Sequence, residues 1–347
     1  MAKNITIAVD AMGGDHAPDM VIEGIAQART LFPGTQFLVF GDEARVQPLL
    51  DQHTDLKAAS TLVHTDEVVS SDMKPSQALR KGRQSSMGLA IQAVKDGTAD
   101  VAISAGNTGA LMALAKFLLR TMPGIDRPAL ISPLPTLRGE SVMLDLGANV
   151  ECDSNNLVQF GIMGAAYVRT VLGLSKPTVA LLNVGVEDLK GKDSIKAAAD
   201  VLRASKHLPL EFAGFVEGND IATGEVDVVV TDGFTGNVAL KTAEGTARLV
   251  TDLLGRAFRS SMSTKLGYLL ARHGLRSLRD HLDPNNHNGG VFLGLNGLVM
   301  KSHGSANAHG FASAVTSAID MAQNDLIRLI SEDLQRIVDD EAAAGVA

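Results

Sequence analysis

Apolar residues in this chain gather in short continuous runs, and longer stretches with helical spacing separate most of these runs. The runs predict strands at residues 5–9, 37–40, 61–64, 101–104, 142–146, 178–182, 210–216 and 226–231. The helical spacing predicts helices at residues 19–31, 85–96, 110–120, 155–172, 193–204 and 238–254. Strands that alternate with helices, and that are apolar on both faces, predict an α/β fold with a mostly parallel sheet.

The last part of the chain has the pattern of one long helix, from about residue 307 to residue 340. One of its faces is apolar at helical spacing and contains Val315, Ile319, Ala322, Leu326, Ile330 and Ile337. This face would pack on the core or on a second subunit. No low-complexity linker divides the 347 residues, so we expect a single domain over 1–347.

Composition and charge narrow the functional classes. The net charge of −8 disfavours general nucleic-acid binding, because a phosphate backbone requires clustered positive charge. The single cysteine, Cys152, excludes an intrachain disulfide and a cysteine-based metal cluster. The first residues lack the pattern of a signal peptide, and no run of about 18 apolar residues predicts a transmembrane helix. We therefore expect a cytoplasmic protein.

Two loops repeat the pattern [Ser/Thr]-x-Gly-x-Thr-Gly between a predicted strand and a helix. Glycines let the backbone approach an anion, and hydroxyls and the free N–H groups of a helix N-terminus are donors for it. The matching pattern predicts a paired anion site, with two ordinary tight turns as the alternative. The residues are Ser104, Gly106, Thr108 and Gly109 in the first loop, and Thr231, Gly233, Thr235 and Gly236 in the second.

Two further loops follow predicted strands. Asp10, Gly13 and Gly14 come after the first strand, without the glycine spacing of a dinucleotide-binding fingerprint. A second loop contains Asn183, Gly185 and Lys190, and it resembles a P-loop only superficially. Asp193 stands where a P-loop requires Ser or Thr, which argues against binding of a nucleoside triphosphate. Lys190 would then neutralise an anion or be a solvated surface lysine.

An imidazole precedes the predicted C-terminal helix. His303 and Ser305 lie in Lys-Ser-His-Gly-Ser-Ala-Asn, where a histidine could carry a proton, although Ser and Asn are also common helix caps. Cys152 lies just before a predicted helix, but no histidine is its neighbour in sequence, so we interpret it as structural.

Residues 253–279 contain cations and no carboxylate, with leucines between the cations. A basic amphipathic segment in an acidic protein predicts contact with a membrane surface or with an acidic partner. The alternative is a helical hairpin at a subunit interface. We expect this segment, about residues 250–283, to protrude from the domain. Its contact residues would be Arg256, Phe258, Arg259, Lys265, Leu269, Leu270 and Arg272.

Taken together, these loops resemble the phosphate acyltransferase family of bacterial phospholipid synthesis. The matching stretches lie in one register from residue 5 to about residue 310: IAVDAMGGDHAP, KPSQALRKGRQSSM, SAGNTGALMALAK, LDLGANVECDS, the Lys190–Gly191 segment, TDGFTGNVALKTAEG and GLVMKSHGSAN. The resemblance implies a three-layer α/β/α Rossmann-like fold of the isocitrate/isopropylmalate dehydrogenase type.

The same resemblance implies an activity and partners. A homodimer would transfer a fatty acyl group from acyl carrier protein to inorganic phosphate, and a membrane glycerol-3-phosphate acyltransferase would use the acyl phosphate. The enzyme would then be cytoplasmic, with peripheral association to the inner face of the membrane. We expect no cofactor and no metal.

The resemblance also leads to a hypothesis of direct transfer, because phosphate is already a nucleophile and a thiol is a tolerable leaving group. The loops at 104–109 and 231–237 would hold phosphate together with Lys190 and Arg80. His303 or Asp232 would move a proton, and Asn107 or Asn237 would donate to the oxyanion. The alternatives are a dehydrogenase on the same fold, a phosphotransacetylase acting on acyl-CoA, and a non-catalytic membrane scaffold for acyl carrier protein.

Overall fold

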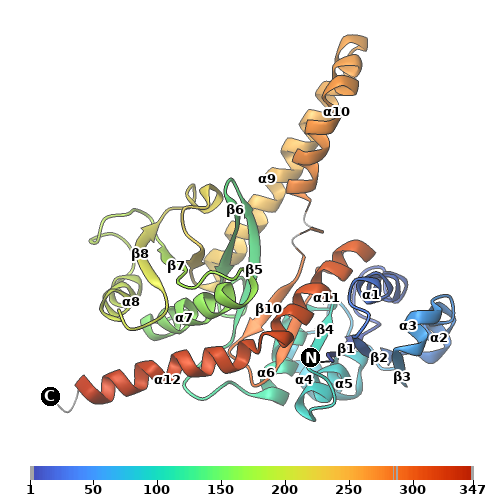
Figure 1. The fold of residues 1–347 in the computed structure, drawn as a ribbon, viewed down its shortest axis with the longest axis horizontal. Coiled ribbons are helices and arrows are strands. Elements are labelled where there is room, and N and C mark those ends of the chain that lie inside the picture. Colours follow the sequence, from blue (N-terminus) through green and yellow to red (C-terminus); the bar gives the residue numbers. More distant parts are fainter. Residues whose placement is uncertain (1–3, 284, 287, 345–347) are drawn as a thin grey trace.

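The computed structural model describes residues 4–283, 285–286 and 288–344. In this part of the chain, eleven strands form one sheet in the order β3-β2-β1-β4-β11-β10-β5-β6-β9-β7-β8 (Figure 1). The strands are β1 (Thr6–Asp10), β2 (Gln36–Gly41), β3 (Ser60–His64), β4 (Val101–Ser104), β5 (Ala129–Thr136), β6 (Gly139–Leu144), β7 (Thr178–Leu182), β8 (Glu211–Val216), β9 (Val228–Val230), β10 (Gly290–Leu293) and β11 (Leu298–Lys301).

Most neighbouring strands are parallel, which confirms the predicted α/β class. Antiparallel pairing occurs only at β11–β10, β10–β5 and β5–β6 among the described strands. These three reversals divide the parallel strands into a first half (β3, β2, β1, β4, β11) and a second half (β6, β9, β7, β8). The strands of the two halves run in opposite directions, so their carboxyl ends do not share one edge of the sheet.

The structure contains three strands that the sequence pattern does not predict: β5, β10 and β11. Pro133 and Pro135 lie in β5, where proline argues against a central strand. The structure accommodates both because β10 pairs only with residues 129–131, so the prolines lie where that edge has no strand partner. β10 and β11 are short strands of a hairpin, too short to carry a clear period.

Helices cover both faces of the sheet. The first face carries α1 (Asp19–Leu31), α7 (Ser154–Val171), α8 (Asp193–Ala204), α11 (Ala308–Gln323) and α12 (Leu326–Ala344). The second face carries α4 (Pro75–Lys81), α5 (Ser86–Lys95), α6 (Thr108–Leu119) and the start of α9 (Gly233–Arg259). Two short helices, α2 (Glu43–Leu50) and α3 (Thr54–Ala58), connect β2 to β3, and α10 (Met262–Leu282) follows α9.

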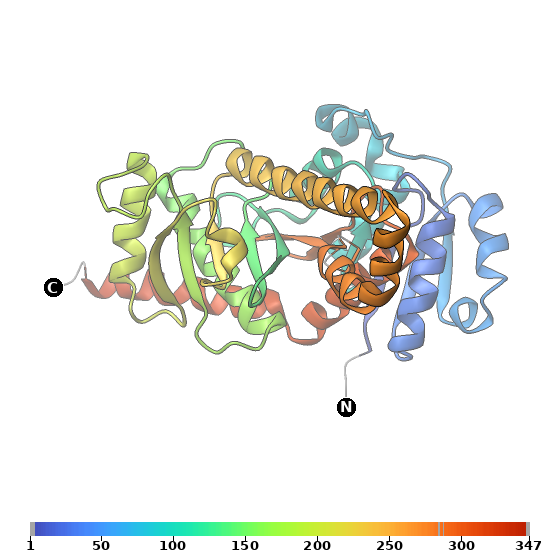
Figure 2. The same ribbon diagram turned by 90° about the horizontal axis from the view of Figure 1, so that it is seen from above.

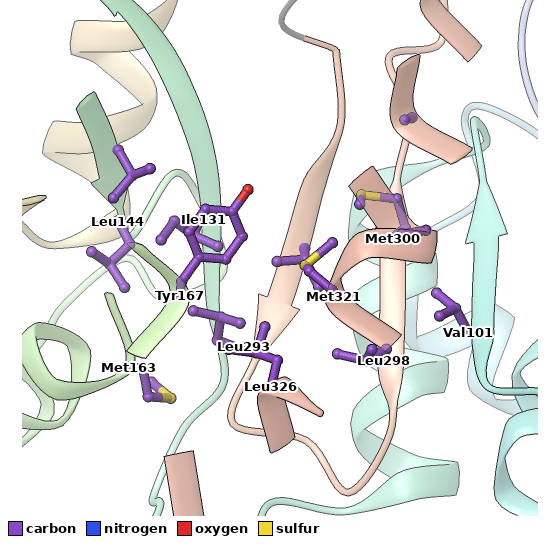
Figure 3. Packing of buried hydrophobic residues seen from close by; sticks show 14 of the residues in the cluster. Val101, Ile131, Leu144, Met163, Tyr167, Leu293, Leu298, Met300, Met321 and Leu326 are labelled. Carbon is purple, nitrogen blue, oxygen red and sulfur yellow. The ribbon is translucent and has the colours of Figure 1, made fainter. Parts of the chain in front are cut away.

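Side chains on successive strand residues separate into two buried clusters, as a sheet covered on both faces requires. In β1, Ile7 and Val9 belong to the cluster under α1 and α11, whereas Ala8 belongs to the cluster under α5. The first cluster is continuous across both halves. Figure 3 shows Val101 of β4 and Leu298 of β11 in the same core as Leu144 of β6 and Tyr167 of α7.

The long C-terminal helix that the sequence predicts is two helices instead. α11 ends at Gln323, and Asp325 has a φ of 53°, a left-handed conformation that interrupts the helix. The predicted apolar face is nevertheless buried at Val315, Ile319, Ala322, Leu326 and Ile330. The side chain of Ile337 lies outside the described residues.

α9 and α10 form an antiparallel hairpin that projects from the body of the molecule, as predicted for residues 250–283 (Figure 1). Seen from above, α9 passes across the molecule between the two halves of the sheet (Figure 2). No residue of α10 is buried. Among the described helices, none has the length and apolar composition needed to cross a membrane. The prediction of a single domain stays a prediction.

Candidate active site

The first half-site lies at the carboxyl ends of β1, β4 and β11. Asp10, at the end of β1, is buried and accepts a hydrogen bond of 2.6 Å from the Ser104 hydroxyl at the end of β4. The same hydroxyl accepts the backbone N–H of Gly106 at 3.0 Å. Burial raises the pKa of the Asp10 carboxyl, and the hydrogen bond from Ser104 acts against this rise. The hydrogen bond between Asp10 and Ser104 thus joins the ends of β1 and β4.

Gly13 shows why this loop contains glycine. A Cβ atom at Gly13 would lie 2.5 Å from the Asp10 carboxyl and 2.7 Å from the backbone nitrogen of Gly106. Gly14, the next residue, has a φ of +115°, which L side chains rarely adopt. The loop after β1 therefore packs directly against the loop after β4.

Asn107 starts α6 and fixes the loop before it. Its Oδ1 accepts the backbone N–H of Ala110 at 3.0 Å, and its Nδ2 donates to the carbonyls of Ser71 at 2.8 Å and Met73 at 3.0 Å. Both amide hydrogens are therefore occupied within the protein. Thr108 and Gly109 are exposed at the first turn of α6, where free N–H groups favour an anion.

One cation, Lys301, ends β11 near this helix start, and His303 follows two residues later. The partly buried Lys301 amine lies 3.5 Å from the carbonyl of Ala105, and burial lowers the pKa of Lys301 to about 8. The His303 Nδ1 lies 3.1 Å from the Ser305 hydroxyl. Burial, and then the nearby Lys241 ammonium, lower the pKa of His303, which favours its neutral form. The site thus holds a cation and an imidazole able to accept a proton.

The second half-site lies at the carboxyl ends of β6, β7 and β9, and it centres on Asp145. This fully buried carboxylate accepts the backbone N–H of Asn149 at 2.7 Å and that of Leu130 at 3.0 Å. Burial raises the pKa of Asp145. Asp145 was absent from the predicted site, although it follows a buried strand just as Asp10 does. That position at a strand end was the signal in the sequence.

The second repeat loop packs on Asp145. The Gly233 N–H donates to the carbonyl of Asn149 at 2.7 Å, and a Cβ at Gly236 would lie 2.0 Å from the carbonyl of Asp145. Asp232 caps α9, since its Oδ1 accepts the Thr235 N–H at 2.8 Å. The repeat in the sequence therefore corresponds to a repeat in structure: each loop joins a strand to a helix N-terminus beside a buried aspartate.

Lys192 contacts the second loop, whereas Lys190 does not. The Lys192 amine lies 3.3 Å from Asp232, and the Lys190 amine instead pairs with Glu187 at 3.0 Å. Asn183 donates to the main-chain carbonyl of Lys190 at 3.1 Å, and Gly185 lies against the Lys190 side chain. Lys192 was not among the predicted residues, because nothing in the sequence distinguishes it from its neighbour two positions earlier.

α9 connects the two half-sites. Asn237, Lys241, Glu244 and Arg248 recur on one face of this helix at spacings of three and four residues. Asn237 donates to the carbonyl of Leu146 in the second half at 3.2 Å, and the Lys241 amine lies 3.4 Å from His303 Nε2 in the first half. The two residues are one helical turn apart, roughly 6 Å along the axis. Groups from opposite edges of the sheet therefore meet on one helix face.

Two other residues lie apart from these contacts. Arg80 is exposed on α4 and lines a surface hollow; within the described residues, its side chain makes no hydrogen bond or ion pair with either loop. Burial raises the pKa of the Cys152 thiol to about 12, so this thiol stays protonated at neutral pH. A protonated thiol is a poor nucleophile, which agrees with the interpretation of Cys152 as a structural residue.

The arrangement suits transfer of a group to an anion. Two helix N-termini and Lys301 supply positive charge, and Lys241 adds a cation that is also paired with Glu244 at 2.9 Å. Asn237 retains a second amide hydrogen. A neutral imidazole stands beside them. A covalent intermediate on the enzyme is not required for such a transfer.

Comparisons with known proteins agree with transfer of a group to an anion. The family model described as "Fatty acid synthesis protein" matches residues 5–329. A phosphate acyltransferase of Rhodospirillum centenum is 58% identical, over 97% of this chain and 95% of its own. A phosphate acyltransferase of Paramagnetospirillum magneticum is 56% identical, over 94% of both chains.

Solved structures show the same fold at low identity. The EutD phosphotransacetylase from Staphylococcus aureus has a TM-score of 0.60 and 16% identity, over 93% of this chain and 95% of its own. A branched-chain phosphotransacylase from Enterococcus faecalis has a TM-score of 0.58 and 16% identity, over 92% and 99%. The Rossmann-like α/β prediction is confirmed. With identities above 50% over nearly the whole chain, this protein belongs to the phosphate acyltransferase family and is an acyltransferase.

Proposed function

We propose that this enzyme transfers a long-chain fatty acyl group from acyl carrier protein to inorganic phosphate, and that the acyl phosphate serves glycerol-3-phosphate acylation. The observation that carries the proposal is the polar face of α9, which joins a cationic half-site to a half-site with a free amide donor. One helix face can hold the two reactants within one turn of each other.

Phosphate binds in the first half-site. The start of α6 presents backbone N–H groups, and the Lys301 amine lies 3.5 Å from the Ala105 carbonyl just before this helix. The Lys241 amine, which is also paired with Glu244, lies 3.4 Å from His303. In the second half-site, the start of α9 offers a similar set of donors. Lys190 and Arg80 would have to move toward these loops to take part, since the Lys190 amine is paired with Glu187.

Transfer proceeds directly. A phosphate oxygen forms a bond to the thioester carbonyl carbon, the carbon–sulfur bond breaks, and the electron pair leaves with the thiolate. His303, held neutral beside Lys241, accepts the phosphate proton and returns a proton to the sulfur. Asn237 donates to the oxyanion, and the structure favours it over Asn107, whose amide hydrogens are both occupied. Asp232 is a helix cap held by Lys192, which leaves His303 as the better proton carrier.

Exposed apolar side chains around the second half-site support a long acyl chain. Leu189 is 92% exposed, Val184 75%, Val150 70% and Phe234 65%. Val150 lies in the loop after β6, Val184 and Leu189 lie in the loop after β7, and Phe234 lies in the first turn of α9, which follows β9. Large exposed apolar side chains gathered at one site mark a binding surface. A saturated chain would cover this rim while its thioester lies near Asn237.

The α9–α10 hairpin supports peripheral membrane contact at the inner face of the membrane. Leu253, Met262, Leu266, Leu269 and Leu270 are each more than half exposed. Arg256, Arg259, Lys265 and Arg272 lie among them, and Phe258 packs edge-on against Tyr268 at 5.7 Å. Such a surface would place the product near a membrane glycerol-3-phosphate acyltransferase. We also propose a homodimer, on the resemblance alone.

A donor comparison tests the proposal. Purified enzyme is incubated with phosphate and either palmitoyl-acyl carrier protein or palmitoyl-CoA, and acyl phosphate is measured over time. We expect acyl phosphate and free carrier protein from the first donor, at a kcat/KM at least about tenfold above that with CoA. A preference for CoA would instead indicate a phosphotransacetylase-like enzyme.

A further inference from the structure

Residues 73–95 and 101–125 contain cations and not one carboxylate, in a chain whose net charge is −8. α4 and α5 lie in the first stretch and α6 in the second, and both α4 and α5 pack against α6. The exposed cations form what we call the α4–α6 basic face: Lys74, Arg80, Lys81, Arg83 and Lys116. Within the described residues, none of the five has a carboxylate within ion-pair distance.

This basic face has an apolar centre. The Arg83 guanidinium lies over the ring of Phe117, 4.4 Å from the ring centroid, and Phe117 is 49% exposed. A surface hollow beside it is lined by Glu67, Val68, Met73 and the segment 80–85, so three cations and one carboxylate share its wall. An exposed aromatic ring and arginines around a hollow are typical of the centre of a protein–protein interface.

The face also adjoins the first half-site. Asn107, which caps α6, holds the carbonyls of Ser71 and Met73. Gly109 lies against Pro75 at the start of α4, since a Cβ there would be 3.1 Å from the proline ring. Ser85, which lines the hollow, is next in sequence to Ser86, which lies beside the Asp10 carboxyl. A partner on this face would therefore sit next to the phosphate site.

We propose that the α4–α6 basic face is the docking surface for an acidic protein that delivers the acyl thioester, namely acyl carrier protein. This inference rests on the proposed function for the identity of the partner. Unpaired cations select a partner of opposite charge, and the contacts of Asn107 with Ser71 and Met73 place this face next to the first half-site.

The α9–α10 hairpin is the competing surface for the same partner. It is also basic, but its cations lie among more than half-exposed leucines along two helices, the pattern of a surface that enters a bilayer. The α4–α6 basic face instead concentrates its charge around one hollow and one aromatic ring. The two surfaces can therefore be separated by charge reversal.

The test compares three double variants of the full chain. The variant Lys81→Glu/Arg83→Glu reverses the basic face, Arg256→Glu/Arg259→Glu reverses the hairpin, and Lys176→Glu/Lys206→Glu is a control with the same charge change on exposed sites of the second half. Binding of fluorescently labelled acyl carrier protein is measured by anisotropy at two salt concentrations. Thermal melting checks that each variant is folded.

We expect the basic-face variant to raise the Kd for carrier protein at least about tenfold and to lower its salt dependence. The hairpin and control variants should bind as the wild type does. With palmitoyl-N-acetylcysteamine, a thioester without a carrier protein, the basic-face variant should keep the wild-type rate. Unchanged binding by the basic-face variant, or loss confined to the hairpin variant, would overturn the inference.

The same experiment separates this inference from the proposed function. Wild-type enzyme that binds carrier protein through the basic face, yet makes no acyl phosphate from it, would refute the proposed reaction and retain the surface. Wild-type enzyme that makes acyl phosphate but loses nothing on charge reversal would do the opposite. Absence of any binding to carrier protein would refute both.

Discussion

Gly236 occupies a position where the backbone of the second half-site leaves no room for a side chain. The carbonyl of Asp145 would lie 2.0 Å from an added Cβ, and this carbonyl belongs to a strand end that cannot move freely. Gly245, about two and a half turns further along the same helix, has no atom within 4 Å of its added Cβ. Substitutions at the two glycines therefore distinguish the effect of close packing against Asp145 from the effect of glycine's low helix propensity.

We expect Gly236→Ala to lower the free energy of unfolding by about 1–3 kcal/mol and to lower kcat strongly, because the start of α9 must shift away from Asp145. Gly245→Ala should be neutral or stabilising by up to about 1 kcal/mol. Denaturant titration and acyl phosphate assays measure both effects. Equal behaviour of the two variants would show that the packing of Gly236 on Asp145 has no special role.

If Lys301 binds phosphate as proposed, phosphate binding depends on pH. Burial lowers the pKa of Lys301 to about 8, so the amine is charged below this pH and becomes neutral above it. We expect the KM for phosphate to rise as the pH passes from 7.5 to 9.5, and Lys301→Gln to have a raised KM that no longer changes over this range. An identical rise in the variant would assign the pH dependence to another group.

Among the elements, α9 has the broadest role, since it starts in the second repeat loop, passes His303 and ends in the projecting hairpin. The burial of its apolar side chains changes along its length. The apolar positions near its start pack on the sheet, whereas Leu253 near its end is 53% exposed. One helix thus joins the reaction site to the surface proposed to contact the membrane.

The hairpin prediction concerns two neighbouring leucines. Leu269→Glu/Leu270→Glu should lower binding to vesicles that contain anionic lipid at least about tenfold, because two apolar side chains are withdrawn from the bilayer surface. Leu137→Glu, at an 87% exposed site outside the hairpin, is the control and should bind as the wild type does. Co-sedimentation measures the binding, and unchanged binding of the double variant would exclude these leucines from the contact.

Elements that are local in sequence could be predicted, and contacts between distant segments could not. The loops at 104–109 and 231–236 were recognisable because strand, loop and helix follow one another directly. The role of Asp145 was missed because it depends on pairing of β6 with β9 and packing of Gly236 across 91 residues of chain. Lys241 was missed because only the fold brings α9 beside His303. The roles of the individual site residues stay predictions.

At the scale of the whole molecule, three antiparallel pairings make the strands of the second half of the sheet run opposite to those of the first half. A sequence repeat at the ends of parallel strands would suggest one shared edge, and this reversal places the two loops on different edges instead. α9 nevertheless links the two half-sites: Gly233 of the second loop lies about 12 Å along the helix axis from Lys241, whose amine is 3.4 Å from His303 of the first half-site. Direct transfer therefore requires that both halves of the molecule act on one pair of reactants.

Mass spectrometry of a reaction with phosphate labelled by ¹⁸O at all its oxygens tests this account most directly. With palmitoyl-acyl carrier protein as donor, we predict palmitoyl phosphate that retains every labelled oxygen, free carrier protein in equal amount, and an enzyme whose intact mass stays unchanged when phosphate is left out. Palmitoyl phosphate that lacks label, a palmitoylated enzyme, or no palmitoyl phosphate from a folded sample would contradict direct transfer to phosphate at this site.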